Sequence, residues 1–88
     1  MKKVIMYTKT YCPYCVMAKQ LLSHHSIQPE EINIEDEPQL REDMIKKTDR
    51  RTVPQIFIED FHVGGYDDLS ALERTGKLAE LLNTTGDK

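Results

Sequence analysis

The sequence contains two cysteines, Cys12 and Cys15, and they stand at the spacing Cys-x-x-Cys. This spacing occurs in redox-active dithiols and also in one half of a structural zinc site. A closed zinc site needs four nitrogen or sulfur ligands, and the chain has no second cysteine pair to supply them. The histidines fit poorly as substitutes, because His24 and His25 are adjacent and His62 stands alone. The pattern therefore favours redox chemistry, and no metal is expected.

Pro13 predicts how the two thiols are presented. Proline is tolerated at the first position of a helix, so a helix that starts at Pro13 makes Cys12 its N-cap and puts Cys15 in its first turn. The free N–H groups and the positive end of the helix dipole would then favour a thiolate at Cys12, and Lys9 adds a nearby cation. We therefore predict that Cys12 is the nucleophile and Cys15 the resolving thiol. The alternative, two inert core cysteines, gives no reason for the Pro13 and Lys9 setting.

The first half of the chain predicts two strands and two helices that position this pair. Residues 4–7 form a short apolar run, typical of a strand buried on both faces, and polar and apolar residues alternate over 31–35. Helices are predicted from residue 13 to about 25 and from 38 to about 47. The strand-helix-strand order implies parallel pairing of the two strands. The apolar residues at helical spacing in the first helix are Tyr14, Met17, Ala18, Leu21 and Leu22.

The second half predicts a hairpin and a helical end. Residues 52–58 form a strand with Pro54 near its beginning, and residues 61–63 return as the second strand of the hairpin. A helix is expected to start after Gly65 and to end at Gly76, followed by a short amphipathic segment over 77–82. We expect one α/β domain over residues 1–83 and a frayed tail over 84–88, which has nothing to bury.

The composition limits the classes of partner. The chain has 15 acidic and 12 basic residues, and its net charge of −3 argues against a general nucleic-acid binder or a basic membrane-surface protein. The apolar run near the N-terminus is too short for a signal peptide or a membrane span. We therefore expect a cytoplasmic monomer, in a reducing compartment where a cysteine pair suits catalysis better than a permanent crosslink.

The order of elements, with Cys-x-x-Cys at the start of the first helix, resembles the thioredoxin fold, a four-stranded mixed sheet flanked by three or more helices. The details resemble a dithiol glutaredoxin. Three motifs at family-like spacings carry the resemblance: Cys12-Pro13-Tyr14-Cys15, Thr52-Val53-Pro54 and Gly64-Gly65-Tyr66-Asp67-Asp68. A thioredoxin proper would be expected to show Trp-Cys-Gly-Pro-Cys, and this chain contains no tryptophan.

The resemblance implies a glutathione site, with glutathione as co-substrate. Lys9 and Arg41 would meet the glycine carboxylate, and the Val53 backbone would pair with the cysteine of the peptide beside a cis Pro54. The start of the helix after Gly65 would hold the γ-glutamyl end, with its carboxylate at the helix N-terminus and its ammonium group at Asp67 or Asp68. The full predicted set is Lys9, Tyr14, Arg41, Thr52, Val53, Pro54, Gly65, Tyr66 and Asp67.

Several of these residues also have simpler interpretations. Arg41 could be a solvated helix residue, and Asp67 and Asp68 could be ordinary capping acids at a helix N-terminus. Many relatives carry a cysteine where this chain has Tyr66. A third-thiol side reaction is therefore absent here, whereas binding through the backbone should survive the change.

The function implied is a glutathione-dependent thiol–disulfide oxidoreductase that reduces protein disulfides and protein–glutathione mixed disulfides. Its partners would be glutathione and disulfide-bonded or glutathionylated proteins, with ribonucleotide reductase as one candidate. Two alternatives stay open: an iron–sulfur cluster carrier, with Cys12 and glutathione as ligands at a dimer interface, and a redoxin reduced by thioredoxin reductase. Pro13 and Cys15 speak against the first, and the Lys9 and Arg41 pair speaks against the second.

Overall fold

The computed structural model describes residues 2–82, which form four strands and four helices. The predicted end of the domain at residue 83 and the predicted frayed tail over 84–88 lie outside the described residues. In chain order the elements are β1 (Val4–Thr8), α1 (Pro13–Ser23), β2 (Glu30–Asn33), α2 (Pro38–Thr48), β3 (Gln55–Ile58), β4 (Phe61–Gly64), α3 (Tyr66–Arg74) and α4 (Lys77–Leu82).

The strands form one mixed sheet in the order β2-β1-β3-β4. β1 pairs with β2 in parallel, as the strand-helix-strand order predicts, because the intervening α1 returns the chain to the same end of the sheet. β3 runs antiparallel to both β1 and β4. The predicted four-stranded mixed sheet with flanking helices is therefore confirmed.

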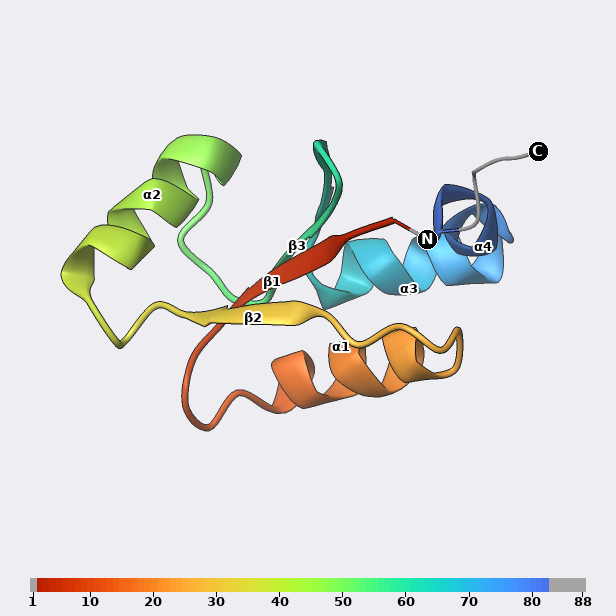
Figure 1. Ribbon diagram of the computed structural model, residues 1–88, viewed down its shortest axis with the longest axis horizontal. Coiled ribbons are helices and arrows are strands. Elements are labelled where there is room, and N and C mark those ends of the chain that lie inside the picture. The colour runs from red at the N-terminus through yellow and green to blue at the C-terminus, as the bar shows by residue number, and fades with distance from the viewer. Residues whose placement is uncertain (1, 83–88) are drawn as a thin grey trace.

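Helices cover the two faces of the sheet unequally. Figure 1 shows α2 on one side of the sheet, with α1 and α3 on the other. The larger hydrophobic cluster includes Met6 of β1, Leu22 of α1 and Leu69 of α3, all fully buried. On the α2 face, a smaller cluster contains Tyr7 of β1, Met44 of α2 and Ile34, which follows β2. The alternation of β1 side chains between the faces explains why its run of residues is almost continuously apolar.

The apolar face predicted for α1 is only partly buried. Ala18 and Leu22 are fully buried, but Tyr14 and Met17 are 58% and 40% exposed. Helical spacing groups them together, yet the first turns of α1 extend past the core to the surface beside the cysteines. There the Tyr14 ring lies 6.0 Å from the ring of Tyr66. Tyr14 and Met17 share the helical spacing of the buried residues but lie at the surface.

Candidate active site

Cys12 and Cys15 lie at the N-terminus of α1 in the arrangement that Pro13 predicts. Cys12 is the N-cap in an extended conformation, Pro13 opens the helix, and the Cys15 N–H donates a hydrogen bond of 3.2 Å to Cys12 Sγ. The two cysteines are joined in a disulfide, with their Cα atoms 5.2 Å apart. Cys12 is 8% exposed and Cys15 2%. Cys12 is therefore the more accessible of the two residues, as a nucleophile needs to be, and the division of roles between the two thiols stays a prediction.

The loop between β1 and α1 is tied to the end of β2. The Thr10 N–H donates to Glu35 Oε1 at 3.0 Å, and Asn33 Nδ2 contacts Thr10 Oγ1 at 3.4 Å. The hydrogen bonds from Thr10 lower the pKa of the Glu35 carboxyl, and the Lys9 cation lowers it further. Tyr11, with φ of 56°, turns the chain from this anchored loop into the helix. The anchor thus fixes where Cys12 begins the helix.

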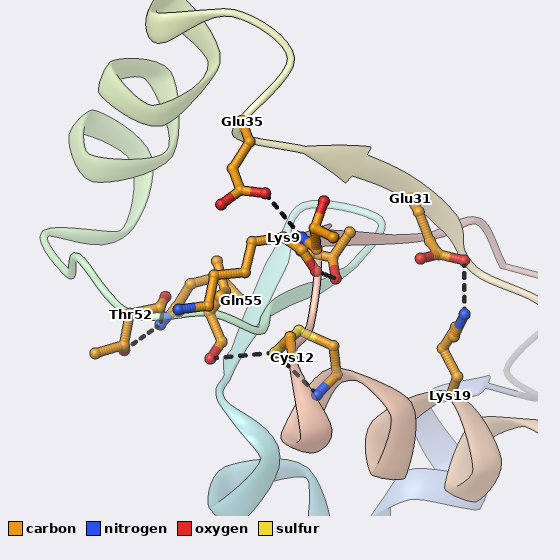
Figure 2. Close-up of a disulfide and its surroundings, with 11 residues drawn as sticks. Lys9, Cys12, Lys19, Glu31, Glu35, Thr52 and Gln55 are labelled. Atoms are coloured by element: carbon orange, nitrogen blue, oxygen red, sulfur yellow. Dashed lines mark hydrogen bonds and ion pairs between the residues drawn. A yellow bond between two sulfur atoms is a disulfide. The ribbon is translucent and has the colours of Figure 1, made fainter.

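The Val53-Pro54 peptide bond is cis, as the resemblance implies, and it lies beside the sulfurs. Cys12 Sγ is 4.0 Å from the Val53 carbonyl oxygen. Figure 2 shows Thr52 and Gln55, which flank this peptide bond, on the side of Cys12 away from Lys19. The segment therefore presents its backbone to any group that approaches the Cys12 sulfur. An extended peptide bound there could pair with it as an added strand.

A surface pocket of about 270 Å³ runs from this segment to the start of α3. It brings together seven of the nine residues predicted to bind glutathione. Asp68, which was predicted as the alternative to Asp67 for the ammonium group, also lines it, and so does Arg50, which was not predicted. The complete lining is Tyr14, Arg50, Thr52, Val53, Pro54, Gly65, Tyr66, Asp67 and Asp68.

The remaining two predicted residues, Lys9 and Arg41, lie outside the lining of this pocket. Both are exposed, Lys9 in the β1–α1 loop and Arg41 on α2. In Figure 2 the Lys9 side chain points toward Thr52 and Gln55. Lys9 can therefore act on the approach to the Pro54 segment, whereas Arg41 would act only on a ligand that extends beyond the pocket.

Asp68 organises the end of the pocket at the start of α3. Its Oδ2 accepts hydrogen bonds from the Gly65 N–H at 2.9 Å and from Arg50 Nη1 at 3.0 Å. These two donors, the backbone N–H first, lower the pKa of the Asp68 carboxyl. Gly64 has φ of 113°, and a Cβ there would collide with the same carboxylate. Asp68 is thus occupied within the protein, which leaves Asp67 as the freer carboxylate for a ligand ammonium group.

Arg50 could not be found from the sequence as part of the site. It stands in the polar link after α2, where a pair of arginines looks like a solvated turn. Its partner Asp68 lies 18 residues later, on a different element. The pairing depends on tertiary structure alone.

Comparison with known proteins identifies the class. The glutaredoxin family model matches residues 4–63. The chain belongs to the glutaredoxin family. It is 50% identical over 82 residues to glutaredoxin 3 of Escherichia coli K12, a match that covers 93% of this chain and 99% of that protein.

Solved glutaredoxin structures agree with this placement. The solution structure of glutaredoxin from Brucella melitensis is 50% identical, with a TM-score of 0.84, and the match covers 96% of this chain and 91% of that one. The buckwheat glutaredoxin–glutathione complex is 31% identical, with a TM-score of 0.85, and its match covers 92% of this chain and 76% of that one. Glutaredoxins are thiol–disulfide oxidoreductases, so the Cys12–Cys15 pair lies in a fold that performs disulfide chemistry.

Residues 2–82 contain neither a cluster of metal-ligating side chains nor a membrane-spanning helix. No group of three or more histidine, cysteine, aspartate or glutamate side chains there is placed to hold a metal ion. In the same part of the chain, none of the helices is both long enough and apolar enough to cross a membrane.

Proposed function

We propose that this glutaredoxin uses glutathione to reduce protein disulfides and protein–glutathione mixed disulfides. The observation that carries the proposal is the pocket that extends from the Pro54 segment to the N-terminus of α3. At the Pro54 segment, the Val53 carbonyl oxygen lies 4.0 Å from Cys12 Sγ. A tripeptide with a central cysteine could place its sulfur at Cys12 and its γ-glutamyl carboxylate at the helix N-terminus. The buckwheat glutaredoxin solved with glutathione, which shares this fold, supports the assignment.

Reduction of a protein disulfide begins at Cys12. Its thiolate attacks one substrate sulfur, which forms a mixed disulfide and releases the other sulfur as a thiolate that takes up a proton. The Cys15 thiolate then attacks Cys12 Sγ, which frees the second substrate thiol and leaves the Cys12–Cys15 disulfide. To regenerate the enzyme, two glutathione molecules then reduce this disulfide to the dithiol and leave as glutathione disulfide. The net reaction converts one substrate disulfide and two glutathione molecules into two substrate thiols and one glutathione disulfide.

Reduction of a glutathionylated protein needs only Cys12. Its thiolate attacks the sulfur of the glutathione portion, and the protein thiolate leaves. The thiolate of a second glutathione then attacks the glutathione sulfur of the Cys12–glutathione disulfide, which forms glutathione disulfide and releases the Cys12 thiolate. For this route the pocket must hold the glutathione portion with its sulfur in line with Cys12 Sγ, the task proposed for the Val53 backbone and for the start of α3.

The helix N-terminus supplies the activation of Cys12. In the reduced protein, the Cys15 N–H that now points at Cys12 Sγ would donate to the thiolate. This hydrogen bond and the helix dipole favour the anion, so we expect Cys12 to titrate well below the value of about 8.5 for a free cysteine. The rate of alkylation by iodoacetamide as a function of pH measures this. A midpoint at or above the free value would remove the physical basis of the nucleophile assignment.

A coupled assay tests the proposed function. A glutathionylated peptide is the substrate, and either glutathione with glutathione reductase or thioredoxin reductase supplies the electrons, with Cys12→Ser as the inactive control. We expect turnover with the glutathione system and background rates with thioredoxin reductase. Turnover that depends on thioredoxin reductase instead would contradict glutathione dependence and would favour the redoxin alternative.

The setting and partners remain part of this proposal. We propose a cytoplasmic monomer whose protein substrates carry disulfides or glutathione adducts, with ribonucleotide reductase as a candidate substrate. Gel filtration of the protein with and without glutathione and iron tests the monomer, because a cluster carrier would form a coloured dimer.

A further inference from the structure

Gln55 is a fully buried polar residue directly behind the Pro54 segment. It is 0% exposed and is the first residue of β3. A buried amide is normally retained only where its donors and acceptors find partners. Gln55 finds them in side chains and backbone next to the pocket, yet Gln55 itself does not line the pocket. Gln55 can therefore affect the pocket only through the neighbouring residues that it holds by hydrogen bonds.

The partners of Gln55 form a directed chain of hydrogen bonds. Gln55 Nε2 donates to the Thr52 carbonyl oxygen at 3.0 Å and contacts Thr52 Oγ1 at 3.3 Å (Figure 2). A carbonyl oxygen can only accept, so the amide nitrogen must face Thr52 and the amide oxygen must face the other way. Gln55 Oε1 there lies 2.8 Å from His62 Nε2. His62 must then carry its proton on Nε2 and donate to Gln55.

The surroundings of His62 suit a neutral donor. Burial lowers the pKa of His62, the nearby Arg50 cation lowers it further, and the Asp68 carboxylate opposes these effects in part. The imidazole packs against the Phe57 ring, with the ring centroids 5.0 Å apart. Arg50 and Asp68 are also the ion pair at the end of the pocket. His62 therefore packs against Phe57 and lies within the electrostatic influence of the ion pair that lines the site.

We propose that His62 and Gln55 are positioning residues that fix the Thr52-Val53-Pro54 segment against Cys12 for the binding of glutathionylated substrates. His62 orients the Gln55 amide, and the amide holds the Thr52 carbonyl, one residue before the Val53 carbonyl that lies 4.0 Å from Cys12 Sγ. Loss of this restraint would let the backbone that pairs with the substrate move, without removing any group that touches the sulfurs. The inference rests on the proposed function and deepens it.

Substitution of His62 tests the proposal, because this residue is only partly buried and its loss should leave the fold intact. His62→Leu removes the donor to Gln55, His62→Gln restores an N–H donor of similar reach, and His24→Leu removes an exposed histidine as a control. With a glutathionylated peptide and glutathione, we expect His62→Leu to raise KM about fivefold, the effect of one ordinary hydrogen bond, with kcat within about twofold of the parent. His62→Gln and His24→Leu should stay close to the parent.

A second measurement separates a positioning role from a merely structural one. Backbone ¹⁵N order parameters at Thr52 and Val53 should fall in His62→Leu and recover in His62→Gln, because the restraint on the segment is lost and then restored. Gln55→Leu should resemble His62→Leu, but its burial makes the histidine variants the decisive ones.

The outcomes separate this inference from the proposed function. An active parent with an unchanged KM in His62→Leu would overturn the inference alone, as would a His62→Gln variant as impaired as His62→Leu. A parent inactive with glutathione would contradict the proposed function, and the order parameters would then decide the inference. Unchanged order parameters at Thr52 and Val53 in His62→Leu would overturn it in that case.

Discussion

Replacement of Gly64 by alanine tests whether close packing between β4 and α3 maintains the proposed glutathione pocket. Gly64 has φ of 113°, a conformation that costs a residue with a Cβ about 1–2 kcal/mol. The new Cβ would also collide with the Asp68 carboxylate. A displaced carboxylate would lose its hydrogen bond from the Gly65 N–H and its ion pair with the partly exposed Arg50. Together these interactions contribute about 1 kcal/mol to stability. The expected loss in the free energy of unfolding is therefore about 2–3 kcal/mol.

Two matched variants divide this loss into its parts. Gly76 also has a positive φ, 79°, but a Cβ there meets nothing within 4 Å, so Gly76→Ala should cost only the backbone portion. In an Asp68→Ala background the collision with the carboxylate is removed and only the Cβ of residue 68, 3.1 Å away, remains close, so Gly64→Ala should cost little more than the backbone portion of about 1–2 kcal/mol. Urea unfolding of the four variants and the parent gives the free energies. KM for a glutathionylated peptide should rise in Gly64→Ala but not in Gly76→Ala.

The prediction fails if Gly64→Ala and Gly76→Ala lose the same stability. Such a result would mean that Asp68 adapts to the Cβ at no cost, and that it does not fix the start of α3. A loss at Gly64 that is as large in the Asp68→Ala background would point to backbone strain alone.

Three further predictions concern the sulfurs and charges of the site. Cys12→Ser should lose all thiol transfer, whereas Cys15→Ser should lose most protein-disulfide reduction but keep deglutathionylation, in which external glutathione resolves; equal losses in both assays would refute these roles. Arg41→Glu should slow turnover of a glutathionylated peptide several-fold at low salt and less at high salt, since a partly solvated charge pair is worth about 1 kcal/mol, with iodoacetamide reactivity unchanged. A rate equal to that of the parent at low salt would mean that Arg41 is a solvated helix residue with no part in glutathione binding. Because its folded-state pKa is lowered, Asp68 should stabilise the protein above its ordinary pKa, and this contribution, measured against Asp68→Asn by urea unfolding, should disappear as pH falls through the lowered value. A difference that does not change with pH would contradict this.

The local part of the site could be predicted from the sequence because each signal acts over a few residues. Proline is favoured at the first position of a helix, so the N-cap position of Cys12 follows from Pro13 beside it. The apolar run of β1 likewise predicts a strand without knowledge of its partners. Helix ends were less certain: α1 ends at Ser23, two residues before the expected end, where the His24 N–H still caps its last turn.

The remainder could not be predicted because it depends on which surfaces meet. Tyr14 and Met17 have the spacing of core residues but reach past the core. Gln55 stands in an otherwise apolar strand, where the sequence gives no sign of the His62 that satisfies its amide seven residues later. The contact between Arg50 and Asp68 joins a loop to a helix N-terminus. Each of these depends on the arrangement of the elements in space.

Val53 packs against both hydrophobic clusters, the large one on the α1 face and the small one on the α2 face. The two cysteines belong to the large cluster alone. Sub-global opening of the less buried α2 layer would therefore release one side of Val53 while the disulfide stays in the closed remainder. We expect amide hydrogen exchange to show a lower opening free energy in α2 than in β1. Glutathione bound at Val53 should raise the opening free energy of α2. Bound glutathione would then couple the opening of the α1 and α2 layers, whose amides would exchange with solvent independently when it is absent.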